Sequence, residues 1–396
     1  MSNLAPTDGG TQKQSSALGV NTLAEILSQP RCWTDSLNQV ESGGIIRRIG
    51  ERFRKTPEWI FVGCGSSYYV ALAAAASWTA ITGTSARAVP ASELLLFPDL
   101  TFSGAREFVP VLISRSGQTS EVVRAAELFE KRQIPSVAVS CASKQKLETL
   151  ATVSILLPGA DEQSTVMTRS FTAMLLALQY VAASLAGKGD LLEALQALPG
   201  VAEMALQDLP IRMREFVNRH LFSDYVCLGQ GPYYGLACES SLKVMEMSRS
   251  YAQSFHTLEF RHGPKSIVSG ATLITFLLSQ ANYGAEAEVL AEMKGLGGTI
   301  VAVASWIDDR VRSTADLVVE LGCALPEYSC LAPFVFSGQL MGFYTALQRG
   351  LDPDRPTNLS RVVLLEDEKS TAKMPQFDAG ATVGQERKSL KCEQYP

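Results

Sequence analysis

The sequence lacks the features that would place the chain on nucleic acid, in a membrane or around a metal ion. Charged residues make up only 19% of its 396 residues and the net charge is −5, whereas binding to nucleic-acid phosphates needs clustered lysine and arginine. The longest apolar stretch, residues 171–186, is interrupted by Gln179 and Tyr180 and is too short to span a bilayer. The three histidines show no HxH or HxxxH spacing. We therefore expect no nucleic-acid or membrane partner, no metal and no cofactor.

The eight cysteines include no CxxC pair, and several lie in apolar runs where cysteine packs as a small hydrophobic residue. Unpaired cysteines of this kind are typical of a reducing environment. Residues 1–19 are rich in serine, glycine, glutamine and threonine, and they lack the basic region and apolar core of a signal peptide. We therefore expect a cytoplasmic protein.

A pattern of strand, small-residue turn and helix occurs twice. The first copy has Gly63-Cys64-Gly65-Ser66-Ser67 after an apolar strand, and the second has Gly229-Gln230-Gly231 in the same place. Later strands repeat at a spacing of 165 residues, so that Ser114 corresponds to Ser279. We interpret the chain as a duplicated α/β domain and expect its function to lie between the two copies.

Strand-like and helix-like segments alternate through both copies, which predicts parallel sheets covered by helices. A helical region over residues 21–53 precedes the first copy, and a helical connector punctuated by Pro199 and Pro210 joins the two. The predicted strands are 59–63, 86–90, 108–114, 135–140 and 153–157, then 224–229, 272–278, 299–304 and 317–320. The predicted helices are 66–82, 119–132, 144–150 and 168–186, then 233–249, 284–295 and 329–348.

These patterns divide the chain into five parts. The two ends are polar or charged and poor in large apolar residues, so we expect them to be disordered. The predicted parts are a leader (1–21), an N-terminal domain (22–198), a C-terminal domain (199–350), an active-site loop (351–365) and a tail (366–396).

The segment 114–121 has the composition of a phosphate-binding loop. It follows an apolar strand and opens a helix, so it combines free backbone N–H groups, the positive end of a helix dipole and several hydroxyls. Ser114, Ser116 and Thr119 supply hydroxyls, and Arg115 supplies a guanidinium that can pair with phosphate oxygens. The alternative is an ordinary helix N-cap, where serine and threonine are common.

The turn at 63–67 has the same phosphate-binding features, but the pattern is weaker. It offers Ser66 and Ser67 at the start of a second helix, and the carboxyl ends of parallel strands meet at one edge of a sheet. Both hydroxyl-rich loops are therefore expected at one crevice. Cys64 is expected to pack there rather than to act as a nucleophile.

Three charged residues provide the candidate acid–base groups. Glu239, Lys243 and Glu246 are spaced by four and three residues, so they share one face of a helix whose other residues are largely apolar. A partly buried carboxylate can be tuned to transfer protons, although exposed surface pairing is the simpler explanation. His262 lies directly before Gly263-Pro264, and we expect the backbone there to orient its side chain.

These residues resemble the SIS (sugar isomerase) domain proteins, a family that includes the isomerase half of glucosamine-6-phosphate synthase, amino-sugar-phosphate deaminases and tagatose-type ketose–aldose isomerases. The resemblance covers roughly residues 22–365. It rests on Glu239-Ser240-Ser241-Leu242-Lys243 with Glu246 and His262-Gly263-Pro264, on 114–119, and on 352–361. It implies two tandem SIS domains, each a flavodoxin-like parallel sheet in an α/β/α sandwich.

The resemblance also implies roles for particular residues. Glu246 would move a proton between C1 and C2 of a phosphosugar through an enediol-type intermediate, together with Lys243 and Glu239. His262 would open the sugar ring from a neighbouring subunit, which implies a homodimer with its active site at the subunit interface. The phosphate would be held by Ser66, Ser67, Ser114, Arg115, Ser116 and Thr119, and the sugar would be lined by Cys64, Gly65, Val166, Met167 and Arg361.

Two departures from the synthase favour the reaction that releases ammonia. Residues 1–19 contain no glutaminase domain, so we expect no ammonia from glutamine within this chain. Arg361 stands where the synthase has a lysine, and a guanidinium stays protonated and cannot form an imine. The leading interpretation is a glucosamine- or galactosamine-6-phosphate deaminase. The alternatives are another phosphosugar isomerase, a fructosyl-amino-acid-phosphate deglycase, or a non-catalytic phosphosugar sensor.

Overall fold

The computed structural model of this chain describes residues 18–53, 55–103 and 107–365. The predicted tail, and residues 1–17 of the predicted leader, lie outside these ranges. Helix α1 (Val20–Leu27) begins inside the predicted leader, and α2 (Gln29–Ser42) and α3 (Ile45–Phe53) complete the expected N-terminal helical region. Both halves of the chain belong to one compact unit that extends to Leu364.

The first half contains a parallel sheet of five strands in the order β2-β1-β3-β4-β5. These strands are β1 (Glu58–Gly63), β2 (Ser85–Pro90), β3 (Phe108–Ile113), β4 (Val137–Ser140) and β5 (Val153–Leu156). The predicted helices are present as α4 (Ser66–Thr82), α7 (Ser120–Lys131), α8 (Lys146–Leu150) and α9 (Arg169–Leu185). Two short helices, α5 (Ala91–Leu96) and α6 (Asp99–Phe102), were not predicted, because each has too few residues to display a period.

The second half repeats this order as β7-β6-β8-β9-β10. Its strands are β6 (Asp224–Gly229), β7 (Tyr251–Phe255), β8 (Thr272–Leu277), β9 (Thr299–Ala304) and β10 (Leu317–Glu320). Its helices are α11 (Pro232–Ser248), α12 (Tyr283–Gly295), α13 (Asp309–Thr314) and α14 (Phe336–Gln348), with short 3-10 turns at Glu259–Arg261, Pro264–Ile267, Glu327–Ser329 and Ala332–Val335. Two sheets with the same strand order confirm the duplicated α/β fold.

The structure corrects the register of the repeat. The Gly63 and Gly229 turns match, since a Cβ on either would meet the backbone four residues later within 2.6 Å. Relative to those turns, β1 pairs Glu58 with Phe108, whereas β6 pairs Asp224 with Thr272, so the third strands are offset by 164 residues. Ser114 therefore corresponds to Leu278, not to Ser279.

Helix α10 (Gly189–Arg219) joins the halves as one helix of 31 residues that continues through Pro199 and Pro210. Each proline removes one backbone hydrogen bond. The apolar face of α10 is buried around both prolines, at Leu195, Leu198 and Leu209, and this burial offsets the loss.

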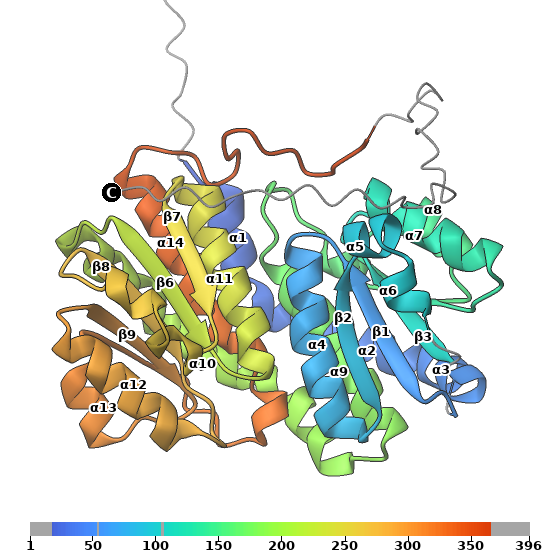
Figure 1. The fold of residues 1–396 in the computed structure, drawn as a ribbon, viewed down its shortest axis with the longest axis horizontal. Coiled ribbons are helices and arrows are strands. Elements are labelled where there is room, and N and C mark those ends of the chain that lie inside the picture. The colour runs from blue at the N-terminus through green and yellow to red at the C-terminus, as the bar shows by residue number, and fades with distance from the viewer. Residues whose placement is uncertain (1–17, 54, 104–106, 366–396) are drawn as a thin grey trace, which may run out of the picture. The chain divides into compact units, whose positions relative to one another are not determined.

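The halves meet where α4 packs beside α11, with α14 on another side of α11 (Figure 1). Glycines make these approaches possible. A Cβ on Gly235 of α11 would lie 2.7 Å from the Ala73 backbone of α4, and one on Gly342 of α14 would lie 2.6 Å from the Lys243 carbonyl. Helix α11 is therefore enclosed on two sides, which buries even its charged face.

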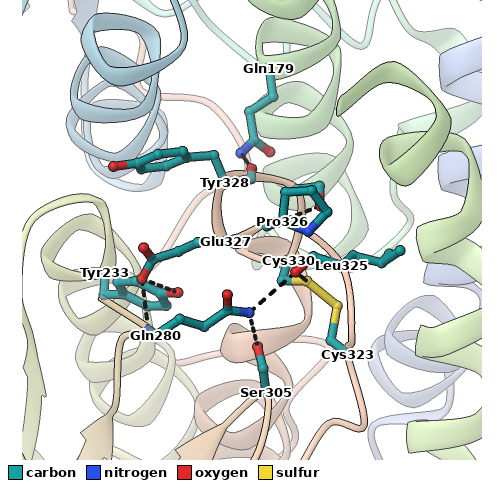
Figure 2. Close-up of a disulfide and its surroundings, with 11 residues drawn as sticks. Gln179, Tyr233, Gln280, Ser305, Cys323, Leu325, Pro326, Glu327, Tyr328 and Cys330 are labelled. Carbon is teal, nitrogen blue, oxygen red and sulfur yellow. Dashed lines mark hydrogen bonds between the residues drawn. A yellow bond between two sulfur atoms is a disulfide. The ribbon is translucent and has the colours of Figure 1, made fainter. Parts of the chain in front are cut away.

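A disulfide joins Cys323 and Cys330 in the segment after β10 (Figure 2). This corrects the expectation that the cysteines are unpaired; Cys32, Cys64, Cys141, Cys227 and Cys238 are free, and Cys392 lies outside the described residues. A disulfide is typical of an oxidising environment and gives no support to the predicted reducing cytoplasm. Among the helices of the described ranges, none has the length and apolarity of a membrane span.

Candidate active site

The turn after β1 presents two hydroxyls at the first turn of α4. Gly65 has φ 54°, in the left-handed region that glycine adopts readily, and it ends the strand directly before the helix. Ser66 and Ser67 follow, and only 6% and 5% of their surfaces are exposed. The thiol of Cys64 is also shielded, and burial raises its pKa to about 12. A thiol that stays protonated is a poor nucleophile.

The loop after β3 gathers the predicted hydroxyls on one turn before α7. The hydroxyl oxygens of Ser114 and Thr119 lie 3.0 Å apart, and Ser116 Oγ accepts from the Gln118 N–H at 3.2 Å. Gly117 has φ 64°, and a Cβ there would lie 2.8 Å from Gln145. This turn has the hydroxyls, the helix N-terminus and the close backbone of an anion cradle.

Arg115 lies in this loop, but its side chain contacts protein groups rather than facing the hydroxyls. Its guanidinium donates to the Glu162 carboxylate at 3.2 Å and to the carbonyls of Thr165, Val166 and Arg361 at 3.0, 3.3 and 2.9 Å. Only 5% of the side chain is exposed. We therefore assign Arg115 to holding the cradle, the loop before α9 and the C-terminal segment together, in place of the direct phosphate contact that the sequence suggested.

A charged cluster on α11 reaches across to the first half. Lys243 Nζ lies 3.2 Å from Glu239, 2.5 Å from Glu246 and 3.2 Å from the hydroxyl of Ser66. Ser66 also donates to Glu239 at 3.2 Å. We call Glu239, Lys243, Glu246 and Ser66 the α11 cluster. It links the predicted acid–base residues directly to Ser66, one of the predicted phosphate ligands.

Burial sets the electrostatics of the α11 cluster. The side chains of Glu239 and Lys243 are completely buried, whereas 19% of Glu246 is exposed. Desolvation raises the pKa of Glu239 from 4.5 to about 8, although Lys243 opposes the shift. Burial would lower the pKa of Lys243, but attraction by Glu239 and Glu246 outweighs it and the pKa is raised. Lys243 is thus a fixed cation, and Glu246 is the carboxylate that solvent or a substrate can reach.

His262 lies in the loop after β7, where its side chain is exposed, and among the described residues no hydrogen bond or ion pair joins it to the α11 cluster. The loop is fixed nonetheless. Gly263 has φ 115°, and Arg261 and Lys265 both pair with Glu292 of α12 at 2.7 Å. Ion pairs thus flank His262 on both sides, and within one chain no hydrogen bond or ion pair among the described residues joins it to the other predicted catalytic residues.

Three of the predicted sugar-lining residues, Val166, Met167 and Arg361, lie on two segments that Arg115 connects. Val166 is buried, and Met167 follows it before α9. The side chain of Arg361 pairs with Asp161, while its carbonyl accepts from Arg115. A guanidinium held by a carboxylate cannot act as a lysine would at this position.

Sequence reasoning missed Glu25, on α1. Only 3% of it is exposed, and its carboxylate accepts from the Gln163 and Ser164 N–H groups and from the Ser164 hydroxyl. Burial raises its pKa. Nothing in its local sequence distinguishes it from a surface glutamate, because its partners lie about 140 residues away.

Comparisons with known proteins agree with this geometry. Residues 53–184 match the SIS domain. The chain is 24% identical to the glutamine–fructose-6-phosphate aminotransferase (isomerizing) of Methanothermobacter thermautotrophicus over 353 residues, which are 87% of this chain and 57% of that protein. The chain thus spans little more than half of that relative's length.

Solved structures are similar over most of the chain. Glucosamine-6-phosphate deaminase from Thermotoga maritima has a TM-score of 0.71 and 27% identity, covering 87% of this chain and 99% of that one. Tagatose-6-phosphate ketose/aldose isomerase from Escherichia coli has a TM-score of 0.74 and 23% identity, covering 88% and 97%. The second likeness concerns the fold alone. Residues 53–184 thus match a SIS domain, and the second half repeats the sheet order of the first.

Proposed function

We propose that the chain is a phosphosugar aldose–ketose isomerase that acts on a hexosamine 6-phosphate and releases ammonia. The observation that carries the proposal is the contact of Ser66, in the hydroxyl-bearing turn after β1, with Lys243 and Glu239. A sugar phosphate anchored at the hydroxyls of the first half would extend its reacting carbons toward the carboxylates of α11.

In the proposed reaction, Glu246 is the base. Its carboxylate removes the proton from C2 of the open-chain amino aldose and returns it to C1, while a second proton passes from the amine nitrogen to the C1 oxygen, so that the aldehyde becomes an alcohol and the amine becomes a C2 imine. Water then hydrolyses the imine to a ketone and ammonia. Lys243 positions Glu246 at 2.5 Å, and a carboxylate that is partly exposed can exchange protons with the substrate.

Ring opening is assigned to His262. Because its side chain is exposed and is not joined to the α11 cluster within one chain, the proposal requires a second copy to supply it, and the enzyme is proposed to act as a homodimer. The cradle hydroxyls of Ser66, Ser67, Ser114, Ser116 and Thr119 are proposed to bind the 6-phosphate.

Deamination is preferred to plain isomerisation on two grounds. The similar Thermotoga maritima deaminase is matched over 99% of its length. Arg361 is paired with Asp161 and cannot form an imine with the open-chain sugar.

The test is ammonia release from glucosamine 6-phosphate and, separately, galactosamine 6-phosphate by the purified full-length protein. Release from one of them would support the deaminase and identify the epimer. Binding of both without release would contradict deamination and favour a sensor or another isomerase. Fructose 6-phosphate interconversion, measured in parallel, would separate those two outcomes.

A further inference from the structure

A cavity of about 420 Å³ opens at the carboxyl edge of the second sheet. It lies beyond β8, β9 and β10 and shares no residue with the candidate active site. Its polar groups come from Ser279, Gln280 and Ser305, and its aromatic walls are Tyr283 and Trp306. A volume of this size is within the range of small-molecule sites.

The internal repeat shows which part of the first half this cavity corresponds to. With the corrected offset of 164 residues, residues 278–280 correspond to residues 114–116, the start of the cradle in the first half. The cavity is therefore the second half's counterpart of the cradle, at the sheet edge where α/β folds bind ligands.

The cavity in the second half lacks the hydroxyl and the free backbone N–H groups that would bind phosphate. Leu278 stands where the cradle has Ser114. The Ser279 N–H donates to Glu286 at 2.6 Å, and the N–H groups of Gln280 and Ala281 donate to Glu327 at 2.8 and 3.3 Å. Because two carboxylates already accept from these N–H groups, an anion would meet repulsion and no free backbone donor.

The residues that line the cavity are uncharged, and its two aromatic side chains suit a ligand that contains a ring. The rings of Tyr283 and Trp306 lie 6.0 Å apart at 44°, and 63% of Trp306 is exposed, an unusual position for so large an apolar side chain. An apolar ring face with exposed edges is what the C–H face of a sugar ring stacks against.

The polar groups beside the rings are fixed in place (Figure 2). The Gln280 amide donates to Ser305 Oγ at 3.1 Å and to the Leu325 carbonyl at 3.3 Å. Its carbonyl oxygen and the Ser305 proton have no partner among the described residues. They can therefore accept from and donate to a ligand hydroxyl.

The wall on the other side is also rigid. Cys323 lines the cavity, and its disulfide to Cys330 closes the segment that carries Leu325. Glu327 in the same segment accepts from the Tyr233 hydroxyl at 3.3 Å, as Figure 2 shows. A preformed wall lowers the entropy that a ligand must lose on binding.

We propose that this cavity binds an uncharged, hydroxylated ring, a non-phosphorylated sugar, at a site separate from the phosphosugar site. The binding of a neutral sugar is argued from the residues of the second half, whereas its separation from a phosphosugar site rests on the proposed function. It implies that the duplicated domain has kept one phosphate site and converted the other to a neutral-sugar site.

The test is saturation-transfer NMR of the full-length protein with methyl β-D-glucopyranoside, methyl β-D-galactopyranoside and N-acetylglucosamine, each up to roughly 10 mM. At least one should bind, and Trp306→Ala should weaken its affinity about tenfold or more, whereas Trp306→Tyr should keep most of it. Leu221→Ala, which removes an 85% exposed apolar side chain elsewhere, is the matched control.

A competition measurement completes the test. Glucosamine 6-phosphate should not displace the bound neutral sugar. The proposal is overturned if none of the three sugars binds, if Trp306→Ala leaves binding unchanged while circular dichroism shows a native fold, or if the phosphosugar competes for the site.

Discussion

The hydroxyl of Ser66 lies 3.2 Å from the ammonium of Lys243, although 177 residues separate them in the sequence. Ser66 belongs to the turn after the first strand of one domain, and Lys243 belongs to the helix after the first strand of the other. The internal repeat therefore places the equivalent βα units face to face. One contributes hydroxyls and the other contributes charges.

The phosphate role of the cradle is tested by Ser116→Ala. Ser116 is partly exposed, so the substitution should leave the fold intact and remove one hydrogen bond to a charged phosphate. Such bonds contribute about 1.5–3 kcal/mol, so KM for the phosphosugar should rise roughly 10- to 100-fold with little change in kcat. Ser313→Ala, at an exposed serine of α13, is the control and should leave KM unchanged. An unchanged KM in Ser116→Ala would remove this residue from the phosphate site.

The raised pKa of Glu239 predicts a pH dependence of stability. The folded state holds the proton more tightly than the unfolded state, so this contribution is complete below pH 4.5 and is lost as pH rises toward about 8. Urea denaturation across this range should show a decline in the free energy of unfolding that Glu239→Gln lacks. Identical slopes for the two proteins would mean that burial does not control this carboxyl.

Arg115→Met tests the buried pair with Glu162. The substitution leaves a completely buried carboxylate without its cation, and such losses cost about 3–5 kcal/mol of unfolding free energy. Hydrogen exchange should also increase at residues 352–364, because the Arg361 carbonyl loses its donor.

The control for Arg115→Met is Lys146→Met, in a pair with Glu127 whose side chains are 60% and 43% exposed. It should cost less than about 1 kcal/mol. Equal losses for the two substitutions, or unchanged exchange at 352–364, would contradict the structural role of Arg115.

The disulfide should stabilise the chain in a way that reductant reverses. Closing a loop with a separation of seven residues is worth roughly 2–3 kcal/mol in the chain-entropy description. Thermal unfolding should occur at a lower temperature after reduction, and the double variant Cys323→Ala, Cys330→Ala should be insensitive to reductant. Free thiols at both positions in the untreated protein, measured by thiol labelling, would show that the bond does not form.

The sequence predicted most of the fold because its strands and helices alternate with short turns. It also predicted the shared face of Glu239, Lys243 and Glu246, since helical spacing follows directly from residue numbers. The one-residue error in the repeat has a physical cause. β3 and β8 are nearly continuous apolar runs buried on both sides, so they contain no alternation from which the register could be read.

Other features depend on distant partners and left no local signal. Strand β7 is a sheet edge with a mostly half-buried, polar sequence, so its pattern did not resemble a core strand. Arg115 looked like a phosphate ligand because the residues that engage it, Glu162 and Arg361, lie 47 and 246 positions away. Local composition identifies an available donor, but only the tertiary fold decides which acceptor it meets.

The most direct test of the central proposal compares Glu246→Gln with the unchanged protein in ammonia release from the active hexosamine 6-phosphate. We predict that kcat falls by roughly 10²- to 10⁴-fold while the phosphosugar still binds, because the amide keeps the shape of the side chain but cannot take up a proton. Glu215→Gln, at an exposed glutamate of α10, should retain full activity. Turnover by Glu246→Gln at the rate of the unchanged protein would contradict the role of Glu246 as the base.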